Sequence, residues 1–174
     1  MHASERSKTS STARLLELVL PDCQIIRVGV RGAAPGLDLK LSSNRTPLLL
    51  FPDASAPVLT RDFLKTLVSP PMLVVPDGTW RQAKRIAHRQ PELLALRRVQ
   101  LPPQPPSNYR LRRQGREGGV CTAEAVARAL GVTDGAQVET ALLEALDQMV
   151  ARIMWSRTSS QAYPPTSVLP EGQE

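Results

Sequence analysis

The stretch "PPMLVVPDGTWRQAKR", residues 70–85, joins three kinds of sequence in one short segment. An apolar run at 72–75 is stopped by Pro76, which favours a short buried strand. An acid, a glycine, a hydroxyl and an indole follow at 77–80, and residues 80–89 have the pattern of a basic helix. The stretch therefore predicts a strand, a polar loop at its carboxyl end and a helix.

A second apolar run precedes this stretch. Residues 48–51 of "TPLLLFPDAS" are apolar and are stopped by Pro52, which again suits a buried central strand. Residues 60–69 between the two runs predict a helix with Thr60 or Asp62 near its start. In parallel sheets ligands sit at the carboxyl ends of strands, so the loops after these two strands are expected to lie at a ligand site.

The remaining elements extend this alternation. Residues 10–20 predict a short helix, 23–30 an alternating strand and 97–101 a short strand. Short apolar strands that alternate with helices predict an α/β protein with a mainly parallel sheet and helices on both faces.

Two helices are predicted in the last third. Residues 121–131 form one, with Thr122 at its amino end and Gly131 as its terminator. The longest spans 136–155. Its apolar stripe predicts a core or partner face: Val138, Ala141, Leu142, Ala145, Leu146, Met149, Val150 and Ile153. Residues 1–155 are expected to form one domain and 156–174 a disordered tail.

The charge of the chain is unevenly distributed. The net charge is +6 over 174 residues. The window 77–116 has ten Lys or Arg against two acids, whereas the rest has twelve basic and fourteen acidic residues. A basic window beside a near-neutral remainder indicates a surface for a polyanion such as nucleic acid. The alternative is an arginine-rich surface that only faces solvent.

Cysteine spacing and hydropathy indicate the cellular compartment of the protein. Cys23 and Cys121 form no CxxC pair, so we expect no metal site and a reducing environment. No apolar run approaches the roughly 20 residues of a membrane span, and residues 1–11 lack the apolar core of a signal peptide. These features predict a cytoplasmic protein without membrane contact.

Asp77 has two interpretations. As a helix N-cap, it accepts a hydrogen bond from the amide of Thr79 or Trp80. As a functional acid, it presents a carboxylate at a helix start, where the dipole favours negative charge. Gly78 lets the backbone turn or lets a ligand approach closely. Trp80 is explained more simply as a core anchor than as a stacking platform.

Basic residues gather around this loop. Arg81, Arg85 and Arg89 recur every four residues and share one helix face. Tyr109 among the arginines of 110–116 suits RNA, where bases stack and phosphates pair. The residues expected to contact RNA are Arg81, Lys84, Arg85, Arg89, Arg112, Arg113 and Arg116.

The start of the helix at 121 has free amides that can hold an anion. Glu124 in its first turn is explained equally well by the helix dipole. Cys121 is not expected to be a nucleophile, because nothing marks a partner base. The sequence contains neither GxGxxG nor a P-loop.

Four blocks together resemble the DTW-domain family of tRNA-uridine aminocarboxypropyltransferases. Residues 11–23 resemble its Asn-Thr-x-Arg-Leu helix and following Leu-Pro, with Ser11 where Asn is common. Residues 48–52 resemble its Phe-Pro strand end, and 77–85 contain its Asp-x-Thr-Trp signature. Residues 107–125 resemble its Ser-x-Tyr-Arg-x-Arg and Cys/Ser-Thr-x-Glu-Ala blocks. One Asp-x-Thr-Trp is weak support, but four blocks in order are strong.

The resemblance implies a SPOUT-related fold with a C-terminal trefoil knot near the cofactor. It implies transfer of the 3-amino-3-carboxypropyl group of S-adenosylmethionine to N3 of a tRNA uridine, with release of methylthioadenosine. Asp77 is then expected to be the catalytic residue. The expected cofactor-binding residues are Leu50, Phe51, Pro52, Gly78, Thr79, Trp80, Tyr109, Arg110, Cys121, Thr122, Ala123 and Glu124.

The sequence also departs from the family pattern. Many members carry a Cys-rich, zinc-like segment and a strand before a His-x-x-Glu motif, whereas here that motif is expected at His2 and Glu5. Two other functions stay open: a catalytically idle RNA-binding module, or a SPOUT-like RNA methyltransferase. Oligomeric state, monomer or homodimer, also stays open, as do the uridine and the tRNA.

Overall fold

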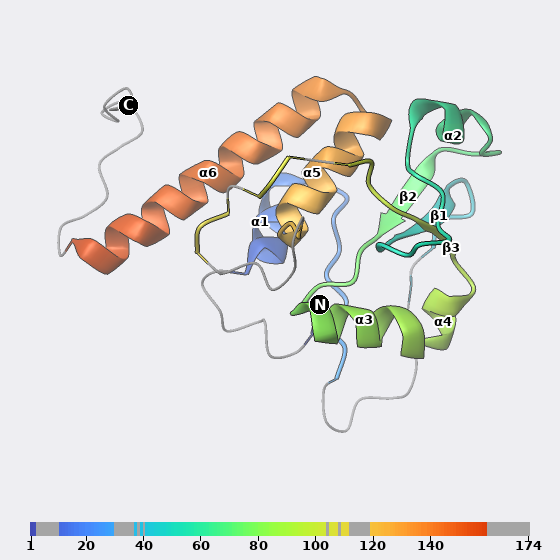
Figure 1. The fold of residues 1–174 in the computed structure, drawn as a ribbon, viewed down its shortest axis with the longest axis horizontal. Helices are drawn as coiled ribbons and strands as arrows, with labels where there is room; N and C mark the ends of the chain where they lie inside the picture. The colour runs from blue at the N-terminus through green and yellow to red at the C-terminus, as the bar shows by residue number, and fades with distance from the viewer. Residues whose placement is uncertain are drawn as a thin grey trace.

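The computed structural model describes residues 1–2, 11–29, 37, 39, 41–103, 105–107, 109–111 and 119–159. Each strand of the described chain is followed by a helix, as Figure 1 shows. In chain order the elements are α1 (Thr12–Val19), β1 (Thr46–Leu50), α2 (Arg61–Lys65), β2 (Pro71–Val74), α3 (Trp80–Arg89), α4 (Pro91–Leu94), β3 (Arg97–Val99), α5 (Thr122–Thr133) and α6 (Ala136–Thr158).

The sheet is parallel and has β1 at its centre. Its order is β2-β1-β3, and β1 runs parallel to both neighbours. Leu48 pairs with Leu73 of β2, and Leu49 pairs with Arg98 of β3. The central strand carries the strongest apolar run, because its backbone and both its faces are covered.

Successive residues of β1 point to opposite faces of the sheet. Leu48 and Leu50 pack in one core cluster with Phe63 of α2, and partly buried residues of α5 join them. Leu49 and Phe51 pack in another cluster with residues of α3 and α4. Helices therefore cover both faces, and the α/β class predicted from the sequence is confirmed.

A third cluster lies beside the sheet and joins α1, α5 and α6. Leu142, Leu146 and Val150 of α6 pack against Leu16 of α1 and Ala127 of α5. Figure 1 shows α6 as the long helix that runs alongside α5, with α1 behind them. Val138 and Met149 of the predicted stripe pack against the same cluster, whereas Ala141 is exposed, so most of the stripe is a core face.

Four sequence expectations need correction. The helix expected at 60–69 spans only Arg61–Lys65, because the chain turns at its C-cap Thr66, whose amide and hydroxyl donate to the backbone oxygen of Phe63. The described part of 23–30 is not a strand, because Val28 makes only an isolated bridge with His2, and alternation alone supplies no continuous ladder. Gly131 does not end α5, which continues to Thr133. Helix α6 continues past residue 155 to Thr158, and 160–174, where the tail was expected, lie outside the described residues.

Gly131 has a packing role instead of a terminating one. A Cβ atom at this position would lie 2.9 Å from the Cβ atom of Glu139 on α6. The missing side chain therefore allows α5 and α6 to approach closely. The turn between them is made at Gly135, whose φ of 114° favours glycine.

Candidate active site

The polar loops after β1 and β2 meet at one edge of the sheet. The two strands are parallel, and Leu49 of β1 pairs with Val74 of β2 near their carboxyl ends. The chain leaves β2 through residues 75–79 and enters α3 at Trp80. Helix α5 begins close to the same edge, because the side chain of Thr122 contacts the loop after β2.

Asp77 is a buried carboxylate in this loop, with 8% of its surface exposed. Its Oδ1 atom accepts a hydrogen bond from Oγ1 of Thr122 at 2.6 Å. Its Oδ2 atom is buried and has no hydrogen-bond partner among the described residues. A buried oxygen without a donor costs free energy, so Oδ2 is an acceptor available to a ligand.

The N-cap of α3 is Thr79 and not Asp77. The hydroxyl of Thr79 accepts from the amide of Gln82 at 3.3 Å, and Oε1 of Gln82 accepts from the amide of Thr79 at 2.9 Å. This capping box leaves the Asp77 side chain out of the helix start. The capping interpretation of Asp77 is therefore wrong.

Gly78 and His2 shape the loop from two sides. Gly78 has a φ of 147°, and a Cβ atom there would lie 3.0 Å from the Cβ atom of Gln82. The amide of His2 donates to the backbone oxygen of Asp77 at 3.0 Å. The His2 ring lies with Nδ1 3.2 Å from Nε2 of Gln82. Asp77 is thus held by its backbone as well as by Thr122.

Trp80 is a half-buried residue packed on Phe51. Their ring centroids are 6.3 Å apart, and the Phe51 ring also lies 6.0 Å from the His88 ring, edge to face. Trp80 packs against the cluster that joins α3 and α4 to the sheet. The interpretation of Trp80 as a core anchor is confirmed, and ligand contact by its exposed part stays a prediction.

Glu124 joins the start of α5 to the segment that precedes it. Its Oε2 atom accepts from the amide of Cys121 at 2.8 Å and from the hydroxyl of Ser107 at 2.6 Å. Oγ of Ser107 also accepts from the amide of Tyr109 at 3.1 Å. Glu124 is 3% exposed, and Tyr109 is buried in the α1–α5–α6 cluster. Both side chains therefore stabilise the fold.

Cys121 and Ala123 are also engaged in the structure. Burial raises the pKa of the Cys121 thiol to about 12, so the thiol is protonated at neutral pH and is a poor nucleophile. The amide of Ala123 donates to Oγ1 of Thr12 at 3.2 Å. The amides expected to meet a ligand carboxylate at this helix start are thus partly satisfied by the protein itself.

The other predicted cofactor residues differ in exposure. The side chains of Leu50 and Phe51 are buried in the two clusters on opposite faces of the sheet, which leaves only their backbone for a ligand. Pro52 and Arg110 are exposed. Of the predicted set, the structure joins Asp77 directly to Thr122, and cofactor contact by every residue of the set stays a prediction.

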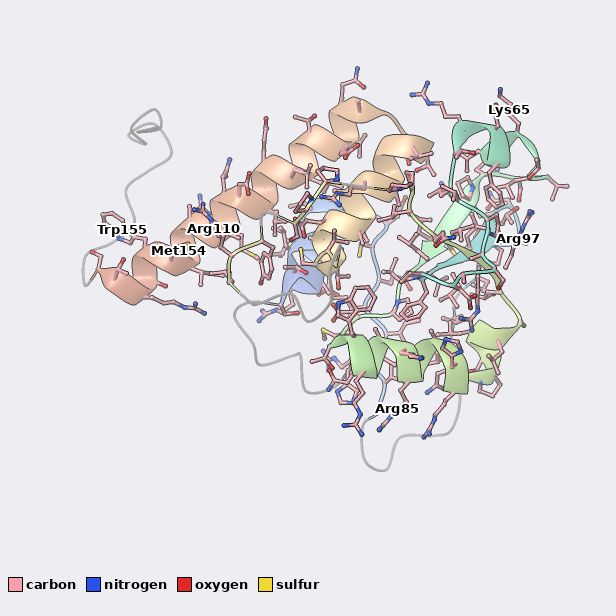
Figure 2. The ribbon with its side chains drawn as sticks, viewed as in Figure 1. Lys65, Arg85, Arg97, Arg110, Met154 and Trp155 are labelled. Carbon is pink, nitrogen blue, oxygen red and sulfur yellow. The ribbon has the colours of Figure 1, made fainter. Side chains whose placement is uncertain are left out.

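Helix α3 presents its basic residues to solvent. Ala83, Ile86 and Ala87 are its buried residues, and they face the sheet. Figure 2 shows Arg85 directed away from the sheet. Arg112, Arg113 and Arg116 lie outside the described residues. The exposed basic residues of the helix are Arg81, Lys84, Arg85 and Arg89.

Two residues near the site were not predicted to act there. The N-cap of α1 is Ser11, and the hydroxyl of the buried Thr12 instead accepts from the amide of Ala123 and holds the start of α5. Ser107 anchors Glu124. Both belong to blocks that resemble the DTW family, and that resemblance was the one sequence signal that could have found them.

Within the described part of the chain, no group of three or more histidine, cysteine, aspartate or glutamate side chains could hold a metal ion. Likewise, none of the described helices is both long and apolar enough to span a membrane.

The fold is an α/β protein with a parallel sheet, and its acidic loop lies at the carboxyl ends of the strands, the edge at which such sheets bind ligands. The family model of the DTW domain matches residues 1–154. The chain therefore belongs to the DTW-domain family.

Curated relatives of this chain are named tRNA-uridine aminocarboxypropyltransferase 2. The protein from Drosophila melanogaster is 35% identical over 138 residues, which cover 76% of this chain and 54% of the relative. The protein from Mus musculus is 31% identical over 137 residues, which cover 76% of this chain and 46% of the relative. The chain thus spans about half the length of the relatives it matches. No solved structure matches it.

Proposed function

We propose that this protein transfers the 3-amino-3-carboxypropyl group of S-adenosylmethionine to N3 of a uridine in tRNA and releases methylthioadenosine. A bond forms between N3 and carbon, the bond between that carbon and sulfur breaks, and the N3 proton goes to the enzyme. Membership of the DTW-domain family and the names of the relatives support the reaction. The observation that carries it is the buried Asp77 carboxylate with an unpartnered Oδ2 atom.

The residues at this edge fit S-adenosylmethionine in the chemistry of their donor set. The amino acid arm has a carboxylate group with which the exposed cation Arg110 would pair, and the buried Oδ2 atom of Asp77 is left for the uridine proton. The backbone of residues 50–52, 78–80 and 120–124 would complete the contacts. When bound, S-adenosylmethionine supplies a sulfonium-activated carbon for attack by a nucleophile.

Asp77 handles the proton in this proposal. Uridine N3 must lose its proton before the nitrogen can attack carbon, and a base within about 3 Å can accept that proton. The Oδ2 atom of Asp77 is the acceptor, since Oδ1 is occupied by Thr122. The loop and the helix starts around Asp77 would align uridine N3 with the carbon that it attacks. Such alignment can supply a large share of the rate enhancement.

The exposed basic residues of α3 would bind the tRNA backbone. Arg81, Arg85 and Arg89 are exposed on a helix that begins directly after the Asp77 loop. Phosphate contacts by Arg and Lys fix the register of a nucleic acid without reading its sequence. The helix would therefore deliver the uridine to the carboxylate at its amino end.

We extend the proposal to the fold relationship and the cell compartment. The three parallel strands, with helices on both faces, are compatible with a SPOUT relative. The trefoil knot of such relatives is proposed for the C-terminal part of this chain. A tRNA substrate supports a cytoplasmic location.

The test is one incubation of the protein with S-adenosylmethionine and unmodified tRNA, with mass spectrometry of small products and digested nucleosides. We expect methylthioadenosine and an aminocarboxypropyl-uridine. Replacing Asp77 with Asn should lower the rate by about 10²- to 10⁴-fold. Asp53→Asn in the neighbouring loop is the matched control and should stay active, because Asp53 bonds Ser55 and Arg98.

Three results would contradict the proposal. An active Asp77→Asn variant would refute the role of Asp77 as base. S-adenosylhomocysteine as the by-product would indicate a methyltransferase. Neither product from a folded protein that binds tRNA would indicate an RNA-binding module.

A further inference from the structure

The two oxygen atoms of the Asp77 carboxylate have different surroundings. Oδ1 accepts from the Thr122 hydroxyl at 2.6 Å, which is the length of a charge-assisted O–H···O⁻ bond. Oδ2 is buried without a donor among the described residues. A carboxylate held at one oxygen cannot exchange its two oxygens by rotation unless that bond breaks.

Thr122 is itself held in place from both sides. It is the first residue of α5, whose start is closed by the capping box of Cys121 and Glu124. The next residue, Ala123, is 2% exposed, and its amide donates to Thr12 on α1. The contacts of α5 therefore fix the position of the Thr122 hydroxyl, and this position does not depend on the loop after β2.

The Asp77 end of the bond is also constrained. The backbone oxygen of Asp77 accepts from the amide of His2, and the capping box of α3 begins two residues later at Thr79. The bond thus joins the start of α5 to the loop that leads into α3, 45 residues away in the chain. Rigid support of this kind fixes an acting group within the narrow geometry that catalysis requires.

We propose that Thr122 is the positioning residue of Asp77: its hydroxyl holds Oδ1 and thereby directs Oδ2 toward the uridine N3 proton. The inference rests on the proposed function and goes further by assigning the Thr122 side chain. That side chain then serves the carboxylate and is not a cofactor ligand. Without the hydroxyl, the carboxylate can turn away from the proton it has to accept.

The test compares three variants of the full chain. Thr122→Val keeps the shape and removes the hydroxyl, and its kcat should fall by about 100-fold while KM for S-adenosylmethionine and tRNA stays close to wild type. Thr122→Ser restores the hydroxyl and should restore kcat. Thr46→Val removes another side-chain hydroxyl, at the opposite end of β1, where it donates to the backbone oxygen of Ser69, and it should lower the urea midpoint without the fall in kcat.

A double-mutant cycle gives a second readout that needs no activity. If the bond to Oδ1 exists, Thr122→Val should lower the urea midpoint clearly in the wild-type background and less in Asp77→Leu, which has no acceptor. In kinetics, Asp77→Asn combined with Thr122→Val should be no slower than Asp77→Asn alone.

Several outcomes would overturn the inference. They are an unchanged kcat in Thr122→Val, a rise in KM in place of the fall in kcat, no restoration by serine, or strictly additive urea midpoints. Failure of the proposed function is recognised separately, because the wild-type protein would then form no product while the urea cycle still reports on the bond.

Discussion

Helices α3 and α5 both begin with a capping box near Asp77, but they place these boxes in different environments. In α3 the box is formed by Thr79 and Gln82, and Thr79 is exposed. In α5 it is formed by Cys121 and Glu124, and Glu124 is 3% exposed. An equivalent local motif therefore has a modest role at the surface and a much larger one in the core.

The remaining residues of the two helices follow the same division. Helix α3 buries small and aliphatic residues on one side and exposes its arginines on the other. Helix α5 is enclosed by clusters on two sides and even buries Arg128, which is 7% exposed. We conclude that α5 supports the site from within the core, whereas α3 offers the site a surface.

The largest difference is expected between Glu124→Ala and Gln82→Ala, which remove the equivalent residue of each box. Glu124→Ala leaves the Cys121 amide and the Ser107 hydroxyl without their acceptor and should lower the free energy of unfolding by about 2–4 kcal/mol. Gln82→Ala should cost about 0.5–1 kcal/mol. Urea unfolding measures both, and equal losses would contradict the comparison.

The close contact between α5 and α6 gives the next effect. Gly131→Ala places a Cβ atom 2.9 Å from that of Glu139, and the main chains must separate to accommodate it. Overpacking of this kind costs about 1–3 kcal/mol. Thermal unfolding provides the measurement, with Ala127→Gly as a control for glycine content in the same helix. If Gly131→Ala were more stable than wild type, helix propensity would outweigh the contact.

These two predictions also separate what the sequence could show from what it could not. Local signals placed α3 well, because its arginine repeat and the preceding proline lie within a few residues of each other, but they did not identify its cap. From the sequence, Gly131 resembled a helix terminator. Its actual role depends on the position of Glu139 in space, which the local sequence does not show. The bond from Thr122 to Asp77 joins residues 45 positions apart, and no periodicity predicts such a contact. The carboxylate was predictable, but its positioning partner was not.

The pH dependence of stability tests the burial of the start of α5. Burial raises the pKa of Cys121 from about 9 to about 12, so the unfolded chain loses this proton at lower pH than the folded chain does. Stability from this group is therefore complete below about pH 9 and falls as pH rises toward 12, by at most about 1.4 kcal/mol per unit.

Cys121→Ser keeps a side-chain acceptor at the N-cap, with oxygen in place of sulfur, and should flatten the decline in unfolding free energy between pH 8.5 and 10.5. Burial also raises the pKa of Cys23, which is less enclosed, so Cys23→Ser is the matched control and should flatten it less. If both variants retained the full decline, the enclosed environment assigned to the Cys121 thiol would be wrong.

The smallest effect on stability is expected at the exposed face of α3. Arg85→Gln should change the free energy of unfolding by less than about 0.5 kcal/mol, because Arg85 points into solvent (Figure 2). If Arg85 contacts one tRNA phosphate, the same variant should weaken tRNA binding and reduce the slope of log K against log salt by about 1.

Lys65→Gln is the control, since Lys65 is equally a surface cation but belongs to α2, where it pairs with Asp62. Equal losses of affinity in both variants would mean that tRNA responds to the overall charge of the protein and not to the surface that begins beside Asp77.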